Sequence, residues 1–389
     1  MSASPELVTL LQELVRIPSP NPPGESTAIA ASIADRLRAG GFTVGVHAPP
    51  NKPQVPSVIA VLGDGAPVIL LHAHIDTVPI AADEATHWSS DPYAAEIKDG
   101  RLYGKGSVDD KAPLAAMMLA GLELAAQGGS RQGTLIIVAA AEEETGGRLG
   151  TKWLADSGLI PEADFIVVGE QTHNRVATAH KGVMRATVRA TGRSVHATNP
   201  DRGVNAITAM AKAVLALDAY HRELGERLHP LAGSPTCNVG VIAGGSTANA
   251  VPDSCAVWID RRMIPREAPA VVQQELINVI AGVDAGAASL SVSEFQTSNW
   301  FESTVDGVLA KQFLSTIRER LDADPGPIGY LPGSDAKHLV GVARGEMVVF
   351  GPGSYEVAHA FDEYVDLAEL SDTHAILSTF LNMALVKNG

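Results

Sequence analysis

Apolar side chains recur at helical spacing soon after the start of the chain. The pattern begins after Pro5, which suits the first turn of a helix, and it stops at Pro18. Its apolar positions are Leu7, Leu10, Leu11, Leu14 and Val15. A second helical pattern covers residues 29–37 and ends at Gly40, where glycine suits a helix C-terminus. Two amphipathic helices are therefore predicted at the start of the chain.

Three segments rich in aliphatic and β-branched residues follow, at residues 42–47, 57–63 and 68–76. The third, VILLHAHID, is apolar on both faces until its end, which is typical of a strand in a sheet covered on both sides. Helical patterns at 114–127 and 150–155 then alternate with strand patterns at 134–141 and 163–170. This alternation predicts an α/β domain with a mostly parallel sheet.

The order of predicted helices and strands changes after residue 177. The order becomes strand, helix, strand, strand, helix and strand between residues 180 and 295, which is the order of a ferredoxin-like α+β domain. Helical and strand patterns resume at 308–321 and 345–351, and a last helix begins at about Leu367. We therefore expect a discontinuous α/β domain, residues 1–177 and 294–389, with an α+β domain of residues 178–293 inserted into it.

Composition excludes several classes of partner. The chain has 29 Lys and Arg against 44 Asp and Glu, a formal net charge of −15, so its field repels phosphate backbones and anionic lipids. We expect neither nucleic acid nor a membrane as a partner. The first 20 residues lack the basic region of a signal peptide and carry Glu6 and Glu13 within their apolar pattern. The two cysteines, Cys237 and Cys255, are too few for a disulfide framework, so we expect a cytoplasmic protein.

Polar side chains gather where the predicted strands end. His74 and Asp76 close one strand, three glutamates at 142–144 follow the next, and Glu170 closes a third. Ligands of open α/β sheets bind at this edge. His74 and Asp76 share one face of their strand, so the carboxylate can orient the imidazole. His72 has the same parity but lies deeper, and we interpret it as a core histidine.

The loop YGKGSVDDK, residues 103–111, carries two more acids. It does not fit a dinucleotide-binding loop, because Asp109 stands where that motif needs its third glycine. Asp110 precedes a predicted helix and is interpreted as its N-cap. Asp109 can instead bridge two cations through its two oxygens.

The glutamates at 142–144 emerge from an apolar strand, where like charges are costly unless cations or protons compensate them. We interpret Glu142 as a solvated loop residue, and the other two as a metal ligand beside a proton-transfer group. His359 lies in the late segment GPGSYEVAHAFDEY. Histidines and carboxylates without cysteine suit a catalytic site for two zinc ions with open positions, and cobalt or manganese would also fit such ligands.

Several of these segments occur together in one known family. The sequence resembles the dinuclear-zinc amidohydrolase and exopeptidase family that includes acetylornithine deacetylase, succinyl-diaminopimelate desuccinylase, aminoacylase-1 and the glutamate carboxypeptidase G group. The shared segments are IPSPNPPGE, LLHAHIDTVP, YGKGSVDDK, AEEETGG, VVGEQT, GRSVHATNPDRGVNAI, NAVPDSCAVWIDRRMIP and GPGSYEVAH. They span essentially the whole chain in the family's order.

The resemblance implies a role for each site residue. His74 and Glu170 would bind one zinc ion, Glu144 and His359 the other, and Asp109 would bridge them. Asp76 would orient His74, and Glu143 would be the general base. A register of the triple glutamate shifted by one position stays open, although ETGG favours Glu143 and Glu144. The family also has a cis peptide after its bridging acid, so we expect one between Asp109 and Asp110.

The inserted domain would be the family's lid, which usually forms a homodimer. His196 matches the lid histidine that reaches the partner subunit's site and helps to stabilise the oxyanion. Asn249 and Arg262 match positions that contact the substrate, and an arginine suits a carboxylate through its planar fork. Arg261 is an adjacent competitor, but the order acid-x-Arg favours Arg262.

Departures from the family pattern bear on the substrate. Asp109-Asp110-Lys111 is more usual in the carboxypeptidase and dipeptidase branches, and Gln171 stands where desuccinylases have proline. Lys337 occupies the place of an arginine that grips the substrate carboxylate, and a solvated helix residue is the alternative interpretation. We expect a hydrolase of N-acyl amino acids similar to acetylornithine deacetylase. A dipeptidase or carboxypeptidase acting on short peptides is the alternative, and a non-catalytic metal-binding relative is disfavoured because every position is filled.

Overall fold

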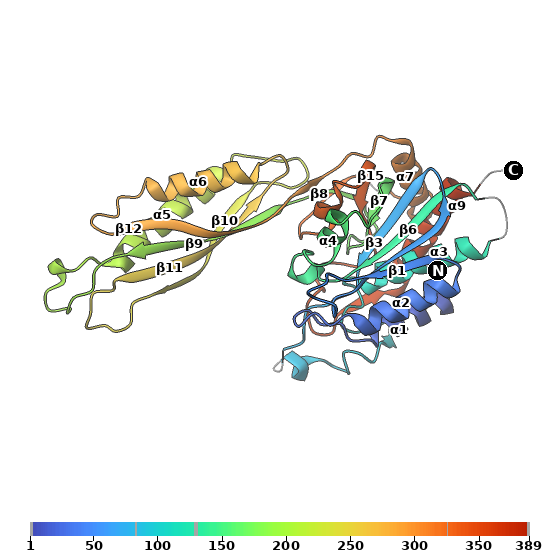
Figure 1. Ribbon diagram of the computed structural model, residues 1–389, viewed down its shortest axis with the longest axis horizontal. Helices are drawn as coiled ribbons and strands as arrows, with labels where there is room; N and C mark the ends of the chain where they lie inside the picture. The colour runs from blue at the N-terminus through green and yellow to red at the C-terminus, as the bar shows by residue number, and fades with distance from the viewer. Residues whose placement is uncertain (1–2, 82–83, 128–130, 325, 387–389) are drawn as a thin grey trace. The chain divides into compact units, whose positions relative to one another are not determined.

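The computed structural model describes residues 3–81, 84–127, 131–324 and 326–386 of the chain. The chain divides into two compact units (Figure 1). The first combines Met1–Thr178 with Ser303–Gly389, and the second is Ala179–Glu302. In the part of the chain that the structure describes, none of the helices combines the length and the apolar character needed to span a bilayer.

A large central sheet organises the first unit. Its strand order is β1-β2-β6-β3-β7-β15-β8, with β14 paired to β8. The short strand β13 continues this order, but it pairs with Ala179 and His180 at the end of β8, and these paired residues fall within the second unit. The strand β3 pairs in parallel with β6 and β7, and β7 pairs in parallel with β15, whereas the outer pairs are antiparallel. The predicted α/β fold with parallel strands at its centre is therefore confirmed. The strands are β1 (Thr43–His47), β2 (Ser57–Asp64), β3 (Val68–His74), β6 (Gly133–Ala140), β7 (Ala163–Val168), β8 (Ala177–His180), β13 (Phe301–Glu302), β14 (Ile328–Tyr330) and β15 (Ala343–Val349).

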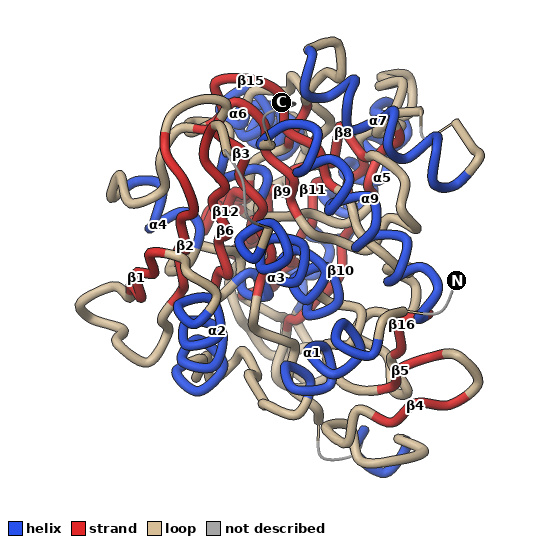
Figure 2. The backbone as a smooth tube through the Cα atoms, turned by 90° about the vertical axis from the view of Figure 1, so that its right-hand side faces the viewer, coloured by secondary structure: helices blue, strands red, loops and turns tan. Residues whose placement is uncertain are grey.

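Helices cover both faces of this sheet. On one face α3 and α7 each pack against α9, and these three helices contact β3, β6 and β7. Figure 2 shows α3 and α9 as helices that run beside each other. The side chains of Ile69, Leu71 and Ala73 in β3 belong to that core. The alternate residue His72 contacts Thr151 of α4, so α4 lies on the opposite face. The helices are α1 (Pro5–Val15), α2 (Thr27–Ala39), α3 (Lys111–Ala126), α4 (Thr151–Asp156), α7 (Val308–Leu321), α8 (Ala336–Leu339) and α9 (Leu367–Leu385).

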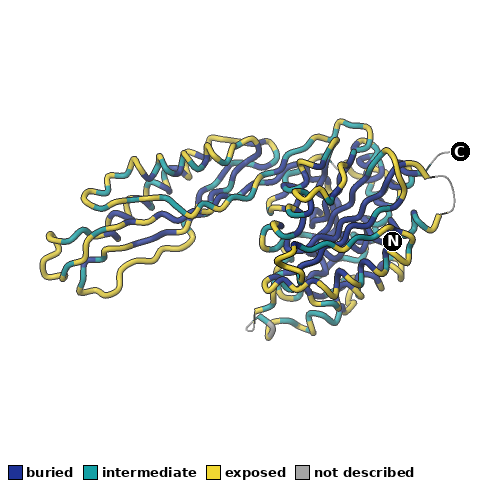
Figure 3. Tube along the Cα trace, in the orientation of Figure 1, coloured by how far each residue is buried: buried dark blue, intermediate teal, exposed yellow. Residues whose placement is uncertain are grey.

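The central strands are the most buried part of the first unit (Figure 3). Every residue of β6 is buried, which explains why its sequence is apolar without alternation. The helix α3 is buried on almost all sides, because α1, α9 and the sheet surround it. A small antiparallel sheet in the order β16-β5-β4 was not expected from the sequence. Its strands are β4 (Glu96–Lys98), β5 (Arg101–Tyr103) and β16 (Tyr364–Asp366), too short to carry a periodic signal.

The second unit has the predicted ferredoxin-like arrangement. Its four antiparallel strands follow the order β10-β11-β9-β12, and α5 and α6 pack on the sheet. Its core is separate from that of the first unit. The elements are β9 (Gly182–Thr191), α5 (Ala206–Leu224), β10 (Thr236–Gly244), β11 (Ser254–Met263), α6 (Pro269–Ala281) and β12 (Ser289–Ser298).

One predicted domain boundary needs correction. A boundary between residues 293 and 294 would cut β12, which continues to Ser298 and still pairs with β9 there. The register shifts between Ser293 and Gln296, and this bulge breaks the alternation by which the strand was recognised. The second unit therefore ends at Glu302 rather than at residue 293.

Candidate active site

The candidate site lies at the carboxyl edge of the parallel strands. His74 ends β3, Glu170 lies two residues after the end of β7, and the glutamates at 142–144 follow β6. Because β6, β3 and β7 are neighbours in the sheet, these three strand ends meet. Asp109 comes from the segment before α3, and His359 from the loop between β15 and β16.

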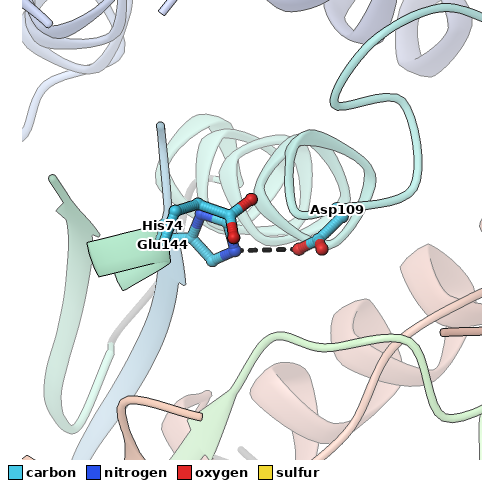
Figure 4. Close-up of side chains that lie close together, drawn as sticks. All are labelled: His74, Asp109 and Glu144. Carbon is cyan, nitrogen blue, oxygen red and sulfur yellow. Dashed lines mark hydrogen bonds and ion pairs between the residues drawn. The ribbon is translucent and has the colours of Figure 1, made fainter. Parts of the chain in front are cut away.

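Asp109 stands between two histidines. Its Oδ1 lies 2.9 Å from Nε2 of His74, and its Oδ2 lies 3.1 Å from Nε2 of His359. The same nitrogen of His359 lies 3.1 Å from Oε2 of Glu144. Figure 4 shows His74, Asp109 and Glu144 gathered at one point, where one ligand atom of each lies within 4.8 Å of the others. The two oxygens of Asp109 thus face two separate imidazoles, as a bridging carboxylate requires.

Glu170 reaches the same centre through two residues that the sequence did not identify as contacts. The hydroxyl of Tyr330 lies 2.9 Å from Oε2 of Glu170 and 2.8 Å from Oε1 of Gln171. The amide of Gln171 donates to Oδ1 of Asp109 at 2.9 Å. All of these side chains are buried. Gln171 therefore contributes a hydrogen bond to Asp109 that a proline at this position could not provide.

Asp76 organises the turn that carries the glutamates. Its Oδ1 accepts the backbone N–H of Glu143 at 3.1 Å, and its Oδ2 accepts the N–H of Glu144 at 3.2 Å and the amide of Asn21 at 2.8 Å. Nδ1 of His74 lies 3.5 Å from Oδ1 of Asp76 but only 2.9 Å from its backbone oxygen. The Asp76 carboxylate thus stabilises the turn that carries Glu143 and Glu144, and it also faces the imidazole of His74.

Glu143 lies beside a buried ammonium group. Nζ of Lys337 lies 3.2 Å from its Oε1, and the Lys337 side chain is only 5% exposed. This contact rules out the interpretation of Lys337 as a solvated helix residue. Burial raises the pKa of Glu143 to about 7, although the Lys337 ammonium opposes that shift.

The residues present fit a centre completed by divalent cations. Burial raises the pKa of Glu144 and, more strongly, that of Glu170, because each loses hydration and meets neighbouring carboxylates. Burial opposes ionisation of Asp109 as well, but hydrogen bonds from His359 and His74 outweigh it and lower the pKa of Asp109. Oxygen and imidazole donors crowded at one point, with acids in excess, are the ligands that zinc, cobalt and manganese accept.

The loop that carries Asp109 is anchored from the C-terminal part of the chain. Oε1 of Glu363 accepts the backbone N–H of Val108 at 3.1 Å and that of Asp109 at 3.2 Å. Its Oε2 lies 3.6 Å from Nζ of Lys105, and both side chains of this pair are 1% exposed. The peptide between Asp109 and Asp110 is cis, as expected. Glu363 lies four residues after His359, so it ties the segments of two candidate ligands together.

Two interpretations of neighbouring acids need correction. Asp110 occupies the N-cap position of α3, but its side chain makes no capping hydrogen bond there. Its Oδ2 instead accepts the backbone N–H of His74 at 3.0 Å. Glu142 is 8% exposed and therefore not solvated. Its carboxylate accepts the hydroxyl of Thr145 at 2.8 Å, so it closes the turn internally. Neither acid contacts solvent as a loop residue would.

His72 is a core histidine, as interpreted from the sequence. It is 1% exposed, and its Nε2 lies 2.7 Å from the hydroxyl of Thr151. The Thr151 hydroxyl in turn lies 2.5 Å from Oδ2 of Asp335. These hydrogen bonds thus connect His72, through Thr151, to Asp335 in the segment that carries Lys337.

Three predicted site residues belong to the second unit. His196 is exposed, and its Nδ1 lies 2.9 Å from the hydroxyl of Thr198. Asn249 lies on the neighbouring loop, because the N–H of Ala197 donates to its backbone oxygen at 2.9 Å. The loops of His196 and Asn249 are therefore side by side. Within this unit, no contact brings either loop to Arg262, in so far as its residues are described.

Arg261 and Arg262 have different surroundings. The Arg261 side chain is fully buried, lies 2.7 Å from Oε1 of Glu267 and donates to the hydroxyl of Tyr220. Arg262 is 39% exposed and pairs with Asp260 at 2.7 Å. Arg261 is thus part of the packing of the second unit, and only Arg262 of the two has a guanidinium open to a ligand.

Comparisons with known proteins identify a family to which this chain is similar. The model of peptidase family M20/M25/M40 matches residues 70–383, which include all the candidate ligands. A probable succinyl-diaminopimelate desuccinylase of Staphylococcus aureus strain MRSA252 is 30% identical over 79% of this chain and 81% of its own length. The acetylornithine deacetylase of Proteus mirabilis strain HI4320 is 29% identical over 97% of this chain and 96% of its own.

A solved structure shares the whole architecture. The structure of a tripeptidase from Staphylococcus aureus strain Mu50 superimposes with a TM-score of 0.77 and covers 98% of this chain and 99% of its own. Its sequence is 20% identical to the present one, so the likeness concerns the fold alone.

Proposed function

Because the chain belongs to peptidase family M20/M25/M40 and is therefore a hydrolytic enzyme, we propose that it cleaves the amide bond of N-acyl amino acids in a metal-dependent reaction. The observation that carries this proposal is the position of Asp109, whose two oxygens face His74 and His359. That arrangement suits two cations sharing one carboxylate, with Glu143 beside them. The named deacylases at about 30% identity support an acyl amino acid as the substrate.

Two divalent metal ions, most simply zinc, are the proposed cofactors. His74 and Glu170 would hold one ion, Glu144 and His359 the other, and Asp109 would bridge them. Such ions, when bound, polarise a carbonyl and lower the pKa of water. Tyr330 would keep Glu170 in place, because its hydroxyl donates a hydrogen bond to that carboxylate. Gln171 would do the same for Asp109 through its side-chain amide.

Glu143 is the proposed general base and acid. It accepts a proton from water as the water oxygen bonds to the amide carbonyl carbon, and it then delivers that proton to the leaving nitrogen as the C–N bond breaks. The products are a carboxylic acid and an amine. Asp76 fixes the backbone on which Glu143 sits, since it accepts the N–H groups of Glu143 and Glu144.

The second unit is proposed as a lid and dimerisation domain. His196 would donate to the oxyanion that forms at the substrate carbonyl, in the site of the partner subunit of a homodimer. Asn249 and Arg262 would contact the substrate, and the open guanidinium of Arg262 suits a carboxylate. The buried free thiols of Cys237 and Cys255 support the proposal of a cytoplasmic location.

A peptidase acting on short peptides is the second candidate. The sequence Asp109-Asp110-Lys111 favours it, since this triplet is more usual in the peptidase branches that the sequence resembles. Both candidates would use the same site, so only the substrate separates them.

The test is a substrate panel. The purified protein, loaded with zinc, is given N-acetyl, N-formyl and N-succinyl amino acids and dipeptides, and the products are identified by mass spectrometry. We expect metal-dependent release of the amino acid from an acylated substrate. Chelation and Glu143→Gln are the matched controls, and both should stop the reaction. Cleavage confined to dipeptides would assign the peptidase function, and no cleavage by metal-loaded protein would refute both candidates.

A further inference from the structure

The strongest feature outside the expected ligand set is the surroundings of Lys337. This residue lies in the short helix α8 (Ala336–Leu339) and is almost completely buried. The family pattern that the sequence resembles has at this place an arginine that grips the substrate carboxylate, so Lys337 departs from that pattern.

The ammonium of Lys337 is directed to groups of the protein. Its Nζ donates to Oε1 of Glu143 at 3.2 Å and to the backbone oxygen of Ser334 at 3.0 Å. Oδ1 of Asp335 lies 3.9 Å from the same nitrogen. Two of the three N–H donors of the ammonium are therefore used within the protein, and the Asp335 carboxylate lies close to it without a hydrogen bond.

A buried series of hydrogen bonds supports the position of Asp335 beside Lys337. Asp335 is 1% exposed, and its Oδ2 accepts the hydroxyl of Thr151, which contacts His72 of β3. Because His72 of β3 and Thr151 of α4 are themselves buried, this chain of contacts fixes the Asp335 carboxylate beside Lys337. Lys337 itself is thereby held against Glu143.

The contact with Glu143 involves only one of its two carboxylate oxygens. Among the residues that the structure describes, Lys337 makes the one hydrogen bond to this carboxylate, and it does so at Oε1. Oε2 is left to exchange a proton. A lysine is a point charge that can engage a single oxygen, whereas the fork of an arginine binds both oxygens of a carboxylate.

We propose that Lys337 is a positioning residue for Glu143, which it holds by Oε1 so that Oε2 stays available for proton transfer, and that it does not receive a carboxylate of the substrate. This inference rests on the proposed function, since it assigns a role relative to the proposed base. It also gives a reason for lysine at this place, because arginine would occupy both oxygens.

The test separates positioning from substrate recognition. The hydrolysis of one N-acyl amino acid and of its α-carboxamide is measured for the wild type, Lys337→Met and Lys337→Arg. Positioning predicts that kcat falls about 10- to 100-fold in both variants, as part of the contribution of a general base, with KM changed less than about threefold. The ratio of kcat/KM between acid and carboxamide should stay as in the wild type.

Controls keep the outcome specific. Lys152→Met removes an exposed lysine of α4, 48% exposed, whose ion pair is with Asp156, and should leave kcat unchanged. Melting temperature and metal content are recorded for each variant, because Lys337→Met leaves the buried Glu143 carboxylate without its hydrogen-bond partner. Lys337→Arg keeps the charge and so tests the geometry even where Lys337→Met does not fold.

Each result decides between the roles. The inference is overturned if the ratio of kcat/KM between acid and carboxamide falls strongly in the variants and KM for the acid rises. That result would leave the proposed function intact. Full activity of Lys337→Arg would also overturn the inference. A wild type that hydrolyses no acyl amino acid would instead refute the proposed function, and the inference with it.

Discussion

Replacing Asp76 with asparagine should weaken both the fold and the metal site. Asp76 is 2% exposed and accepts three N–H groups, those of Asn21 and of the backbone of Glu143 and Glu144. Asparagine has the same shape, but one of its two terminal atoms is an NH₂ donor. In either orientation at least one N–H of the turn then faces another donor.

The magnitude follows from counting these contacts. An amide group at the Oδ1 position loses the contact with Glu143, and one at the Oδ2 position loses the contacts with Asn21 and Glu144. A hydrogen bond to a charged group contributes about 1.5–3 kcal/mol. The less costly orientation loses one bond, so we expect Asp76→Asn to lower the free energy of unfolding by about 2 kcal/mol. Because the turn carries Glu144, metal affinity should fall about 10- to 100-fold.

The assay combines urea unfolding of the metal-free protein with titration of zinc into the folded protein. The control is Asp35→Asn, which changes a carboxylate that is 79% exposed and forms an ion pair with Arg38. That change should alter stability by less than about 0.5 kcal/mol and leave zinc affinity unchanged. If Asp76→Asn behaves like this control, Asp76 does not organise the turn and the account of it is wrong.

Glu143→Gln should keep two metal ions per chain and abolish hydrolysis, whereas Glu144→Gln should lose metal. Metal analysis and product release measure these effects. Hydrolysis by Glu143→Gln would assign the role of general base to another residue. Glu363→Gln leaves the buried charge of Lys105 without its partner and should lower the free energy of unfolding by about 3 kcal/mol, part of which Lys105→Met should restore in urea titrations. His196→Ala should retain both metals and lose about 100- to 1,000-fold in kcat, and unchanged kinetics would remove His196 from the reaction.

Much of the fold and the location of the site could be predicted from the sequence. The apolar runs of β3, β6 and β7 predicted parallel strands, and the side chains after them had to meet at one edge. This rule places His74, the glutamates at 142–144 and Glu170 at that edge, and the choice of Glu144 among the glutamates depends on the resemblance. Asp109 and His359 lie on long segments without a periodic pattern, so their place depended on the resemblance.

The contacts that support the site could not be predicted. Tyr330 hydrogen-bonds to Glu170 across 160 positions of sequence, and Glu363 reaches the N–H of Asp109 across 254. Neither has a local pattern that distinguishes it from a surface residue. Asp110 and Glu142 were misinterpreted for the same reason, because a loop acid beside a helix or strand usually faces water and here long-range packing buries it.

The central claim is a centre of two metal ions that share Asp109, and the number of bound ions tests it most directly. Zinc is titrated into metal-free protein by calorimetry, and bound metal is counted by elemental analysis for the wild type, His74→Ala, His359→Ala and Asp109→Ala. Two ions that share Asp109 should give two bound ions in the wild type, one in each histidine variant and none in Asp109→Ala. A single ion in the wild type, or two ions retained by Asp109→Ala, would contradict this claim.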